Sequence, residues 1–160
     1  MFKAILVTTA LAHFKLTNPP TRGFDDLKEF TAPCSGFPLS TRTPFQFVST
    51  LSITSYHSTA SYNTSISFSQ DPQTQSDFVP WGGVVQCTLG NCPDVPFDFQ
   101  KAFPDKVKTG VNATLQVIFN SPDGILYNCG DITFTDSASS LTNSALKHFS
   151  LLPLVLLFVQ

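Results

Sequence analysis

The sequence predicts an all-β protein built as an antiparallel β-sandwich. Short runs in which apolar and polar residues alternate recur along the chain, and turn residues separate them. Only 12% of the 160 residues are charged, whereas the chain contains 12 prolines and 8 glycines. That composition is typical of a loop-rich extracellular module rather than of a helical cytosolic protein. The length allows one domain together with processing signals.

Six or seven short strands are expected in chain order. Two prolines after Asn18 end the first extended segment, because proline fixes φ and lacks an N–H donor. Strands of this number and length favour a sandwich of the immunoglobulin or fibronectin III type. The candidate segments are residues 13–16, 44–48, 51–57, 62–68, 113–119, 125–129 and 131–135.

Residues 113–119 form the clearest of these strands, and a defined turn follows it. The sequence Ser-Pro-Asp-Gly at residues 121–124 places proline at i+1 and glycine at i+3 of a turn. Period-2 alternation predicts which side chains face the core. The inward set is Leu115, Val117 and Phe119, and the outward set is Thr114, Gln116 and Ile118.

The first twelve residues have the features of a secretory signal peptide. A basic start and a short apolar run end in Ala10-Leu11-Ala12, an A-x-A cleavage pattern. Cleavage after Ala12 would make His13 the first residue of the mature protein. Because signal peptides usually have ~15–30 residues, either this leader is unusually compact or the true start lies upstream. The alternative is that residues 1–11 form the first strand and His13 is an internal residue.

The four cysteines predict two disulfide bonds in a secreted chain. Three pairings exist for the set Cys34, Cys87, Cys92 and Cys129. Cys87 and Cys92 would close a short loop whose turn is supplied by a Gly-Asn pair. That pairing leaves Cys34 to join Cys129 over a long range. Zinc binding is disfavoured, because the sequence has no C-x-x-C pair and few histidines.

Charge and sequons fit the same extracellular compartment. Residues 15–136 hold seven basic and eleven acidic side chains, and this acidic balance argues against a nucleic-acid partner. Asn63 and Asn112 each begin an N-x-S/T sequon and are the predicted glycosylation sites.

The C-terminal residues 137–160 predict a glycosylphosphatidylinositol attachment signal. Small residues at 137–140 are followed by a mostly polar spacer and an apolar tail at 149–159. A tail of this length is too short for a ~30 Å hydrocarbon core at roughly 1.5 Å per residue. Ser137 is the preferred attachment residue, with Asp136 nearly as suitable. Residues 13–136 would then remain as the mature domain.

Processing would leave two histidines, and together they predict a copper site. As an N-terminal residue, His13 offers its α-amine and its Nδ1 to one metal ion. His57 lies at a connection between two strands, at an end of the sandwich where functional loops gather. Three nitrogens in this arrangement, a histidine brace, suit a single Cu(II) ion. The alternative for His57 is an ordinary hydrogen-bonded loop histidine.

Several short motifs occur in order along nearly the whole chain: H-F-x-L, P-P-T-R-G-F-D-D, P-C-S-G-F, G-V-N-A-T-L-Q-V and D-G-I-L-Y-N-C-G-D-I-T-F. This combination resembles the fungal GPI-anchored copper acquisition proteins, which are similar in fold to lytic polysaccharide monooxygenases. The resemblance implies that an aspartate, Asp131, joins the histidine brace as a further ligand. Ser35 and Gly130 depart from the residues usual in that family, but both replace one small residue with another.

The resemblance implies a copper-acquisition protein on the extracellular face of the plasma membrane, held in the outer leaflet by its lipid anchor. A plasma-membrane copper transporter is the expected recipient of the metal. We expect no enzymatic activity, because an anionic oxygen ligand stabilises Cu(II) and occupies a position that an oxygenase leaves open. The alternatives are an oxidative enzyme acting on cell-wall glycans and a structural wall protein without a metal.

Overall fold

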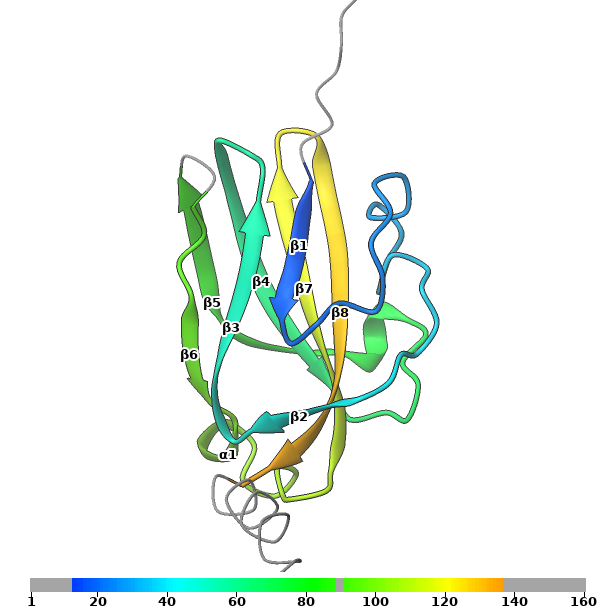
Figure 1. The fold of residues 1–160 in the computed structure, drawn as a ribbon, viewed down its shortest axis with the longest axis vertical. Helices are drawn as coiled ribbons and strands as arrows, with labels where there is room; N and C mark the ends of the chain where they lie inside the picture. Colours follow the sequence, from blue (N-terminus) through cyan, green and yellow to red (C-terminus); the bar gives the residue numbers. More distant parts are fainter. Residues whose placement is uncertain (1–12, 89–90, 137–160) are drawn as a thin grey trace, which may run out of the picture.

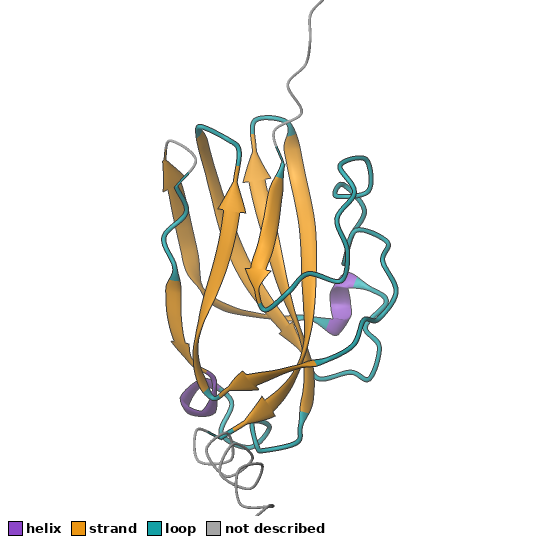
Figure 2. Ribbon diagram, in the orientation of Figure 1, coloured by secondary structure: helices purple, strands orange, loops and turns teal. Residues whose placement is uncertain are grey.

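A computed structural model describes residues 13–88 and 91–136 as two β-sheets packed face to face (Figures 1 and 2). One sheet has three strands in the order β1-β3-β6, and the other has five in the order β2-β8-β7-β4-β5. The predicted β-sandwich is therefore confirmed. The strands are β1 (Phe14–Asn18), β2 (Thr43–Gln46), β3 (Val48–Ser55), β4 (Thr59–Ser67), β5 (Val79–Thr88), β6 (Val95–Asp98), β7 (Asn112–Ser121) and β8 (Gly124–Thr135).

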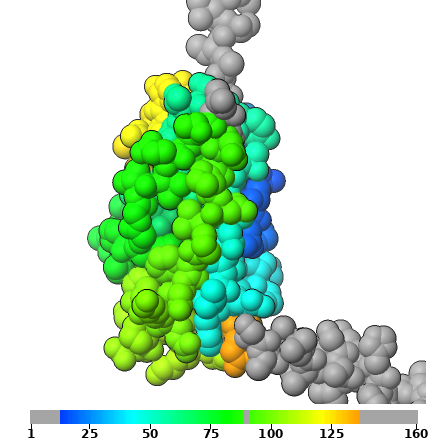
Figure 3. Space-filling view, turned by 90° about the vertical axis from the view of Figure 1, so that its left-hand side faces the viewer, coloured from blue at the N-terminus to red at the C-terminus, as the bar shows by residue number. Residues whose placement is uncertain are grey.

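Helix is confined to two short elements of the described chain, the 3₁₀ turn η1 (Gln75–Asp77) and α1 (Phe99–Ala102). No helix within the described ranges is long and apolar enough to cross a membrane. The edge formed by β5 and β6 covers the face seen in Figure 3. The long connection between β1 and β2 lies at the opposite edge in Figure 1.

Strand pairing follows the sequence pattern with three differences. Strand β8 is one continuous strand, where the alternation predicted two. Strands β5 and β6 lie in segments that the alternation did not mark as strands. Strand β2 pairs with β8 in parallel, so the five-stranded sheet is not purely antiparallel. The β7–β8 hairpin turns where the Ser-Pro-Asp-Gly pattern predicts, with Ser121 paired to Gly124.

The core lies between the sheets and is rich in phenylalanine. Phe14 of β1 stacks on Phe119 of β7, with ring centroids 4.5 Å apart and ring planes at 8°. Stacked aromatic side chains bury large apolar areas and add a specific ring contact. The three residues of β7 predicted to face inward are all fully buried: Leu115, Val117 and Phe119.

The outer face of β7 is buried as well, contrary to the expectation for Thr114 and Gln116. The connection between β1 and β2 covers this face, so polar side chains there are paired with protein groups instead of water. Gln116 donates from Nε2 to the carbonyl of Pro33 at 2.8 Å and bonds to Gln75 at 2.9 Å. Strand alternation alone cannot show that a loop will cover the second face.

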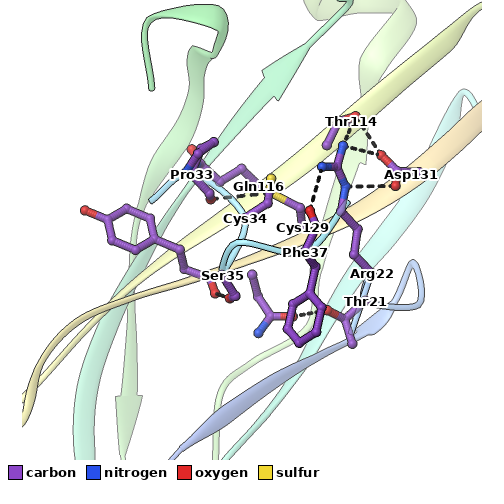
Figure 4. The surroundings of a disulfide bond; sticks show 12 residues. Thr21, Arg22, Pro33, Cys34, Ser35, Phe37, Thr114, Gln116, Cys129 and Asp131 are labelled. Carbon is purple, nitrogen blue, oxygen red and sulfur yellow. Dashed lines mark hydrogen bonds and ion pairs between the residues drawn. A yellow bond between two sulfur atoms is a disulfide. The ribbon is translucent and has the colours of Figure 1, made fainter. Parts of the chain in front are cut away.

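Both predicted disulfides are confirmed, and one of them fixes this covering loop. Cys34 in the loop joins Cys129 of β8 (Figure 4). Cys87 joins Cys92 across a short loop. The loop approaches β8 closely beside the first disulfide. A Cβ atom on Gly130 would lie 2.7 Å from Cγ of Pro19 and 2.8 Å from the carbonyl oxygen of Pro20. Gly130 is therefore needed for this contact, and an alanine would force the loop outward.

Candidate metal centre

The two predicted ligand histidines lie at the same end of the sandwich. The backbone N–H of Tyr56 donates to the carbonyl of His13 at 2.9 Å, so His57 follows directly after a residue paired with His13. This contact continues the antiparallel pairing of β1 with β3, in which Phe14 is opposite Ser55. Both imidazoles are buried, with 6% of His13 and 5% of His57 exposed.

The His13 ring contacts two acidic side chains of the loop between β1 and β2. Its Nδ1 and Oε2 of Glu29 form a hydrogen bond of 2.8 Å, and its Nε2 lies 3.4 Å from Oδ2 of Asp26. Glu29 is fully buried, whereas about half of the Asp26 side chain is exposed. Burial raises the pKa of Glu29 to about 7, although the hydrogen bond and charge of His13 act in the opposite direction.

The His57 ring packs on the core and faces a third carboxylate. Its centroid lies 5.8 Å from that of Phe119, and its backbone N–H donates to Oγ of Ser55 at 3.1 Å. The Nε2 of His57 lies 3.8 Å from Oδ2 of Asp123, at the tip of the β7–β8 hairpin. From the sequence, Asp123 is expected only as a turn residue, although it begins the last of the motifs that carry the family resemblance.

The histidine nitrogens at this end have unused bonding capacity. Among the described residues, the Nε2 atoms of His13 and His57 are both buried without a hydrogen-bond partner. An unpaired buried polar atom costs roughly 1–3 kcal/mol, so such atoms usually have a function. In the described part of the chain, however, no three His, Cys, Asp or Glu side chains are already gathered as a metal site. A metal ion here would need a further ligand, such as the α-amine that cleavage before His13 would create.

Asp131 lies elsewhere, which corrects the ligand set implied by the resemblance. Its two carboxylate oxygens accept from Nε and Nη2 of Arg22, each at 2.9 Å (Figure 4). The backbone N–H and hydroxyl of Ser40 donate to it at 2.9 Å, and the hydroxyl of Thr114 donates at 2.7 Å. Both oxygens of this carboxylate are therefore fully engaged by protein donors.

The strand register also separates Asp131 from the histidines. Asp131 is paired with Thr114 on β7, whereas the His57 ring contacts Phe119 on the same strand. Five residues of a β-strand span roughly 17 Å at about 3.3 Å per residue. The structure thus brings His57 next to Asp123, at the tip of the hairpin, and places Asp131 well along β8 from that tip.

The ion pair makes Asp131 a source of acid sensitivity. Burial raises the pKa of Asp131, but the hydrogen bonds from Arg22, Ser40 and Thr114, with the Arg22 charge, outweigh burial and hold that pKa below its usual value. A carboxyl group with a lowered folded-state pKa stabilises the fold above its unfolded-state pKa and loses that effect as the pH falls through the folded-state pKa.

We therefore expect the free energy of unfolding to decrease below a pH of about 4, the unfolded-state pKa of aspartate. Urea denaturation at a series of pH values between 7 and 2.5 would measure this decrease. The variant Asp131→Asn removes the group and should show a shallower dependence in the same range. Parallel curves for the two proteins would contradict the assignment.

The remaining predicted sites fall into two groups. Asn63 is exposed on β4, whereas Asn112 is half-buried and its Oδ1 accepts from the Thr133 hydroxyl at 2.7 Å. Both stay predicted glycosylation sites, and Asn63 is the more accessible. The signal segment 1–12 and the attachment residue Ser137 with its C-terminal signal lie outside the described residues.

The fold is a β-sandwich with two disulfides, and two buried histidines with nearby carboxylates lie at one end of it. These features define a class of protein suited to hold a metal ion. The sequence model of the BIM1-like copper acquisition factor domain matches residues 11–147. The chain belongs to the family of BIM1-like copper acquisition factors. Copper binding is the property that this membership implies.

Individual relatives support the same membership. The chain is 32% identical to copper acquisition factor BIM1 of Cryptococcus neoformans var. grubii over 91% of its own length and 75% of that protein. It is 32% identical to the protein of the same name from Cryptococcus neoformans var. neoformans over 82% of its length and 64% of that protein. An uncharacterized protein of Aspergillus fumigatus is also 32% identical, over 83% of this chain and 60% of that protein.

Two solved structures of lytic polysaccharide monooxygenases are similar in part. The enzyme from Kitasatospora papulosa aligns with a TM-score of 0.45 and 14% identity, over 59% of this chain and 51% of the enzyme. The enzyme from Jonesia denitrificans aligns with a TM-score of 0.42 and 17% identity, over 77% of this chain and all of the enzyme.

Proposed function

We propose that the mature protein binds one Cu(II) ion at the histidine end of the sandwich and serves in copper acquisition. The proposed nitrogen ligands are the α-amine and Nδ1 of His13 and the Nε2 of His57. Asp123 is the carboxylate closest to His57 and would supply an oxygen beside the metal. The observation that carries the proposal is the pair of buried histidines at one end of the fold, where the Nε2 of His57, a proposed ligand, has no hydrogen-bond partner among the described residues.

The donor set suits copper better than other divalent ions. Imidazole and amine nitrogens in a planar arrangement favour Cu(II), which also heads the affinity order of the divalent metals. The buried His57 imidazole packs on Phe119, and this contact would hold its orientation when the metal leaves. In this function copper is the cargo, and the protein binds, orients and shields it.

The proposed setting follows from the two terminal signals. A cleaved leader would expose His13, and a lipid anchor near Ser137 would hold the domain at the outer leaflet of the plasma membrane. There the protein could pass copper to a plasma-membrane transporter. Cell-wall glycans would surround the domain, and its acidic charge makes nucleic acid an unsuitable partner.

We further propose that copper binding here is not linked to enzymatic oxidation. The Asp123 carboxylate stands 3.8 Å from the His57 ring, and an anionic oxygen at that place would stabilise Cu(II) over Cu(I). The copper-loaded protein should therefore release no oxidised oligosaccharides from chitin or β-glucan in the presence of a reductant. Oxidised products would instead favour the alternative, a copper-dependent enzyme acting on the wall.

Copper titration of the protein beginning at His13 tests the proposed site. The wild type should bind one Cu(II) per chain, and the His57→Ala variant should bind at least about 100-fold more weakly, because one of three nitrogen ligands is lost. The Asp123→Asn variant should lose about 10-fold, as expected for a weaker or outer ligand. Competition against a chromophoric chelator measures each affinity.

Asp105→Asn is the matched control for Asp123→Asn, since Asp105 is an exposed carboxylate outside the histidine end. It should bind copper as the wild type does. A wild type that binds no copper would overturn the proposed function. Unchanged affinity in the His57→Ala variant would remove His57 from the ligand set.

A further inference from the structure

A polar groove of about 360 Å³ lies across β4, β5 and the end of β7. It reaches the histidine end, because Thr59 at its lining follows His57 by two residues and Pro122 precedes Asp123. None of the described residues that line the groove is charged or aromatic. Such a lining disfavours ions and suits a neutral ligand that both donates and accepts hydrogen bonds.

Three polar side chains form a row across this groove. Strand register pairs Ser61 of β4 with Asn120 of β7 on one side and with Gln86 of β5 on the other. Paired residues of neighbouring strands share a face of the sheet, and Ser61 faces outward because Tyr62 after it is in the core. Within the described chain, none of the three side chains makes a hydrogen bond. Their amide and hydroxyl groups are therefore available to a ligand.

Asn63, a predicted glycosylation site, lies on the same face of β4. It is exposed and follows Ser61 by two residues, a separation of roughly 7 Å along a strand. The pairing register shifts at this point, so residues 82–84 of β5 lie opposite Asn63. There is room beside it, since a Cβ atom on Gly83 would meet nothing within 4 Å. A glycan on Asn63 would begin at the edge of the groove.

Along β4, such a glycan has one open direction. Ser65, the next outward residue, is only 1% exposed. It is paired with Gln116, whose side chain bonds to Pro33 of the connection that covers this part of the sheet. In the other direction the outer face is open at Ser61, and the groove continues from there to the histidine end.

From this arrangement we infer that the groove binds an uncharged saccharide, which is supplied by the chain's own glycan on Asn63. The first sugars of an N-linked glycan are uncharged and present hydroxyl and N-acetyl groups. Both kinds of group pair well with side-chain amides and hydroxyls, which also donate and accept. Gln86 and Asn120 provide the amides, Ser61 lies between them, and the bound glycan covers one flank of the histidine end.

A tethered sugar fits this groove better than a free one, because the groove has few sources of affinity. Its described lining offers no aromatic ring on which a sugar could stack, and water competes for each hydrogen bond. A sugar attached to Asn63 is present at an effective concentration in the millimolar range, so weak contacts are enough to hold it. A free wall glycan would need stronger contacts than these.

Mass spectrometry and NMR of the protein secreted by a eukaryotic host test the contact. Asn63 should carry a glycan. Nuclear Overhauser effects should connect the N-acetyl methyl groups of its first sugars to the side-chain amides of Gln86 and Asn120. Both measurements use the wild type without copper, so they depend neither on the folding of a variant nor on the proposed function. An unmodified Asn63, or a glycan that makes no contact with these amides, would overturn the inference.

A cycle of melting temperatures measures what the contact contributes. The glycosylated wild type should melt about 2–4 °C above Asn63→Gln. When Gln86 and Asn120 are both changed to alanine, this gain should fall below about 1 °C. Gln46→Ala is the matched control, because Gln46 is exposed and paired with Thr135 at the opposite end of the sandwich, and it should keep the full gain. Equal gains in all three backgrounds would contradict a glycan bound in the groove.

The Asn63→Gln protein distinguishes the two sources of saccharide. Chitobiose, the disaccharide of N-acetylglucosamine, should shift the amide resonances of Gln86 and Asn120 without saturating up to about 10 mM, because the tether is absent. Saturation below about 1 mM would show that the groove binds a free glycan without help from Asn63. That result would overturn the assignment of the groove to the chain's own glycan.

Discussion

Replacing Asp131 with asparagine should lower the free energy of unfolding by about 3–5 kcal/mol while leaving the copper affinity of the folded protein unchanged. The Arg22 side chain is only 2% exposed and has its bidentate partner in Asp131. Removing the negative charge would leave a buried guanidinium with weaker contacts, a 3.4 Å bond to the Phe37 carbonyl and a 4.0 Å approach to Asp71. An unpaired buried charge is among the costliest single defects in a fold.

The expected effect is large because the ion pair fastens a long loop. The backbone N–H of Arg22 donates to the Cys129 carbonyl at 2.7 Å, next to the Cys34–Cys129 disulfide. Ser40, near the far end of the same loop, donates twice to Asp131. The carboxylate therefore joins two distant parts of the loop to β8, and its loss should loosen both.

The stability and the copper affinity of Asp131→Asn and Asp123→Asn distinguish the roles of the two aspartates, and urea denaturation measures the stability. The first variant should lose stability and keep copper affinity, and the second should keep stability and lose affinity. The opposite pattern, with Asp131→Asn stable but poor in copper binding, would restore Asp131 as a ligand. It would also mean that the ion pair with Arg22 opens when the metal binds.

Much of the sandwich could be predicted from the sequence, because period-2 alternation depends only on neighbouring residues along one strand. It identified the strands that became β3, β4, β7 and β8, and the chemistry of the 121–124 turn located the hairpin. It missed β5 because ten residues containing Trp81 and two glycines do not alternate cleanly. The parallel pairing of β2 with β8 could not be predicted either, because the path of the long loop before β2 decides which strand it pairs with.

The candidate site was predictable only in part for a related reason. His13 and His57 carry a signal in the sequence, since one follows a cleavage pattern and the other ends a strand. Asp123 lies just before β8 and Asp131 lies within it, eight residues further on and roughly 26 Å away in an extended chain. Which of them lies beside the histidines depends on strand direction and register. Glu29 was missed because its contact with His13 is made by a loop that folds back.

Acetylating the α-amine of His13 in the mature chain should weaken Cu(II) binding at least about 100-fold, because the brace would lose one of its three nitrogen ligands. The α-amine of an N-terminal residue has a pKa near ~7.8, so a metal displaces its proton close to neutral pH. Acetylation turns that amine into an amide with no free α-amine beside it, and such an amide does not bind Cu(II) readily at neutral pH. Two nitrogens would then remain, and they come from separate residues without a shared chelate ring.

Two proteins that both begin at His13 measure this effect, one with a free and one with an acetylated α-amine. Chelator competition gives the two affinities, and EPR reports whether three nitrogens are bound. The His57→Ala change should reduce affinity strongly in the first protein and little in the second, because the second has no brace to lose. Equal copper affinity in the two proteins would exclude the α-amine as a ligand. The site would then consist of side chains alone, and signal cleavage would not control copper binding.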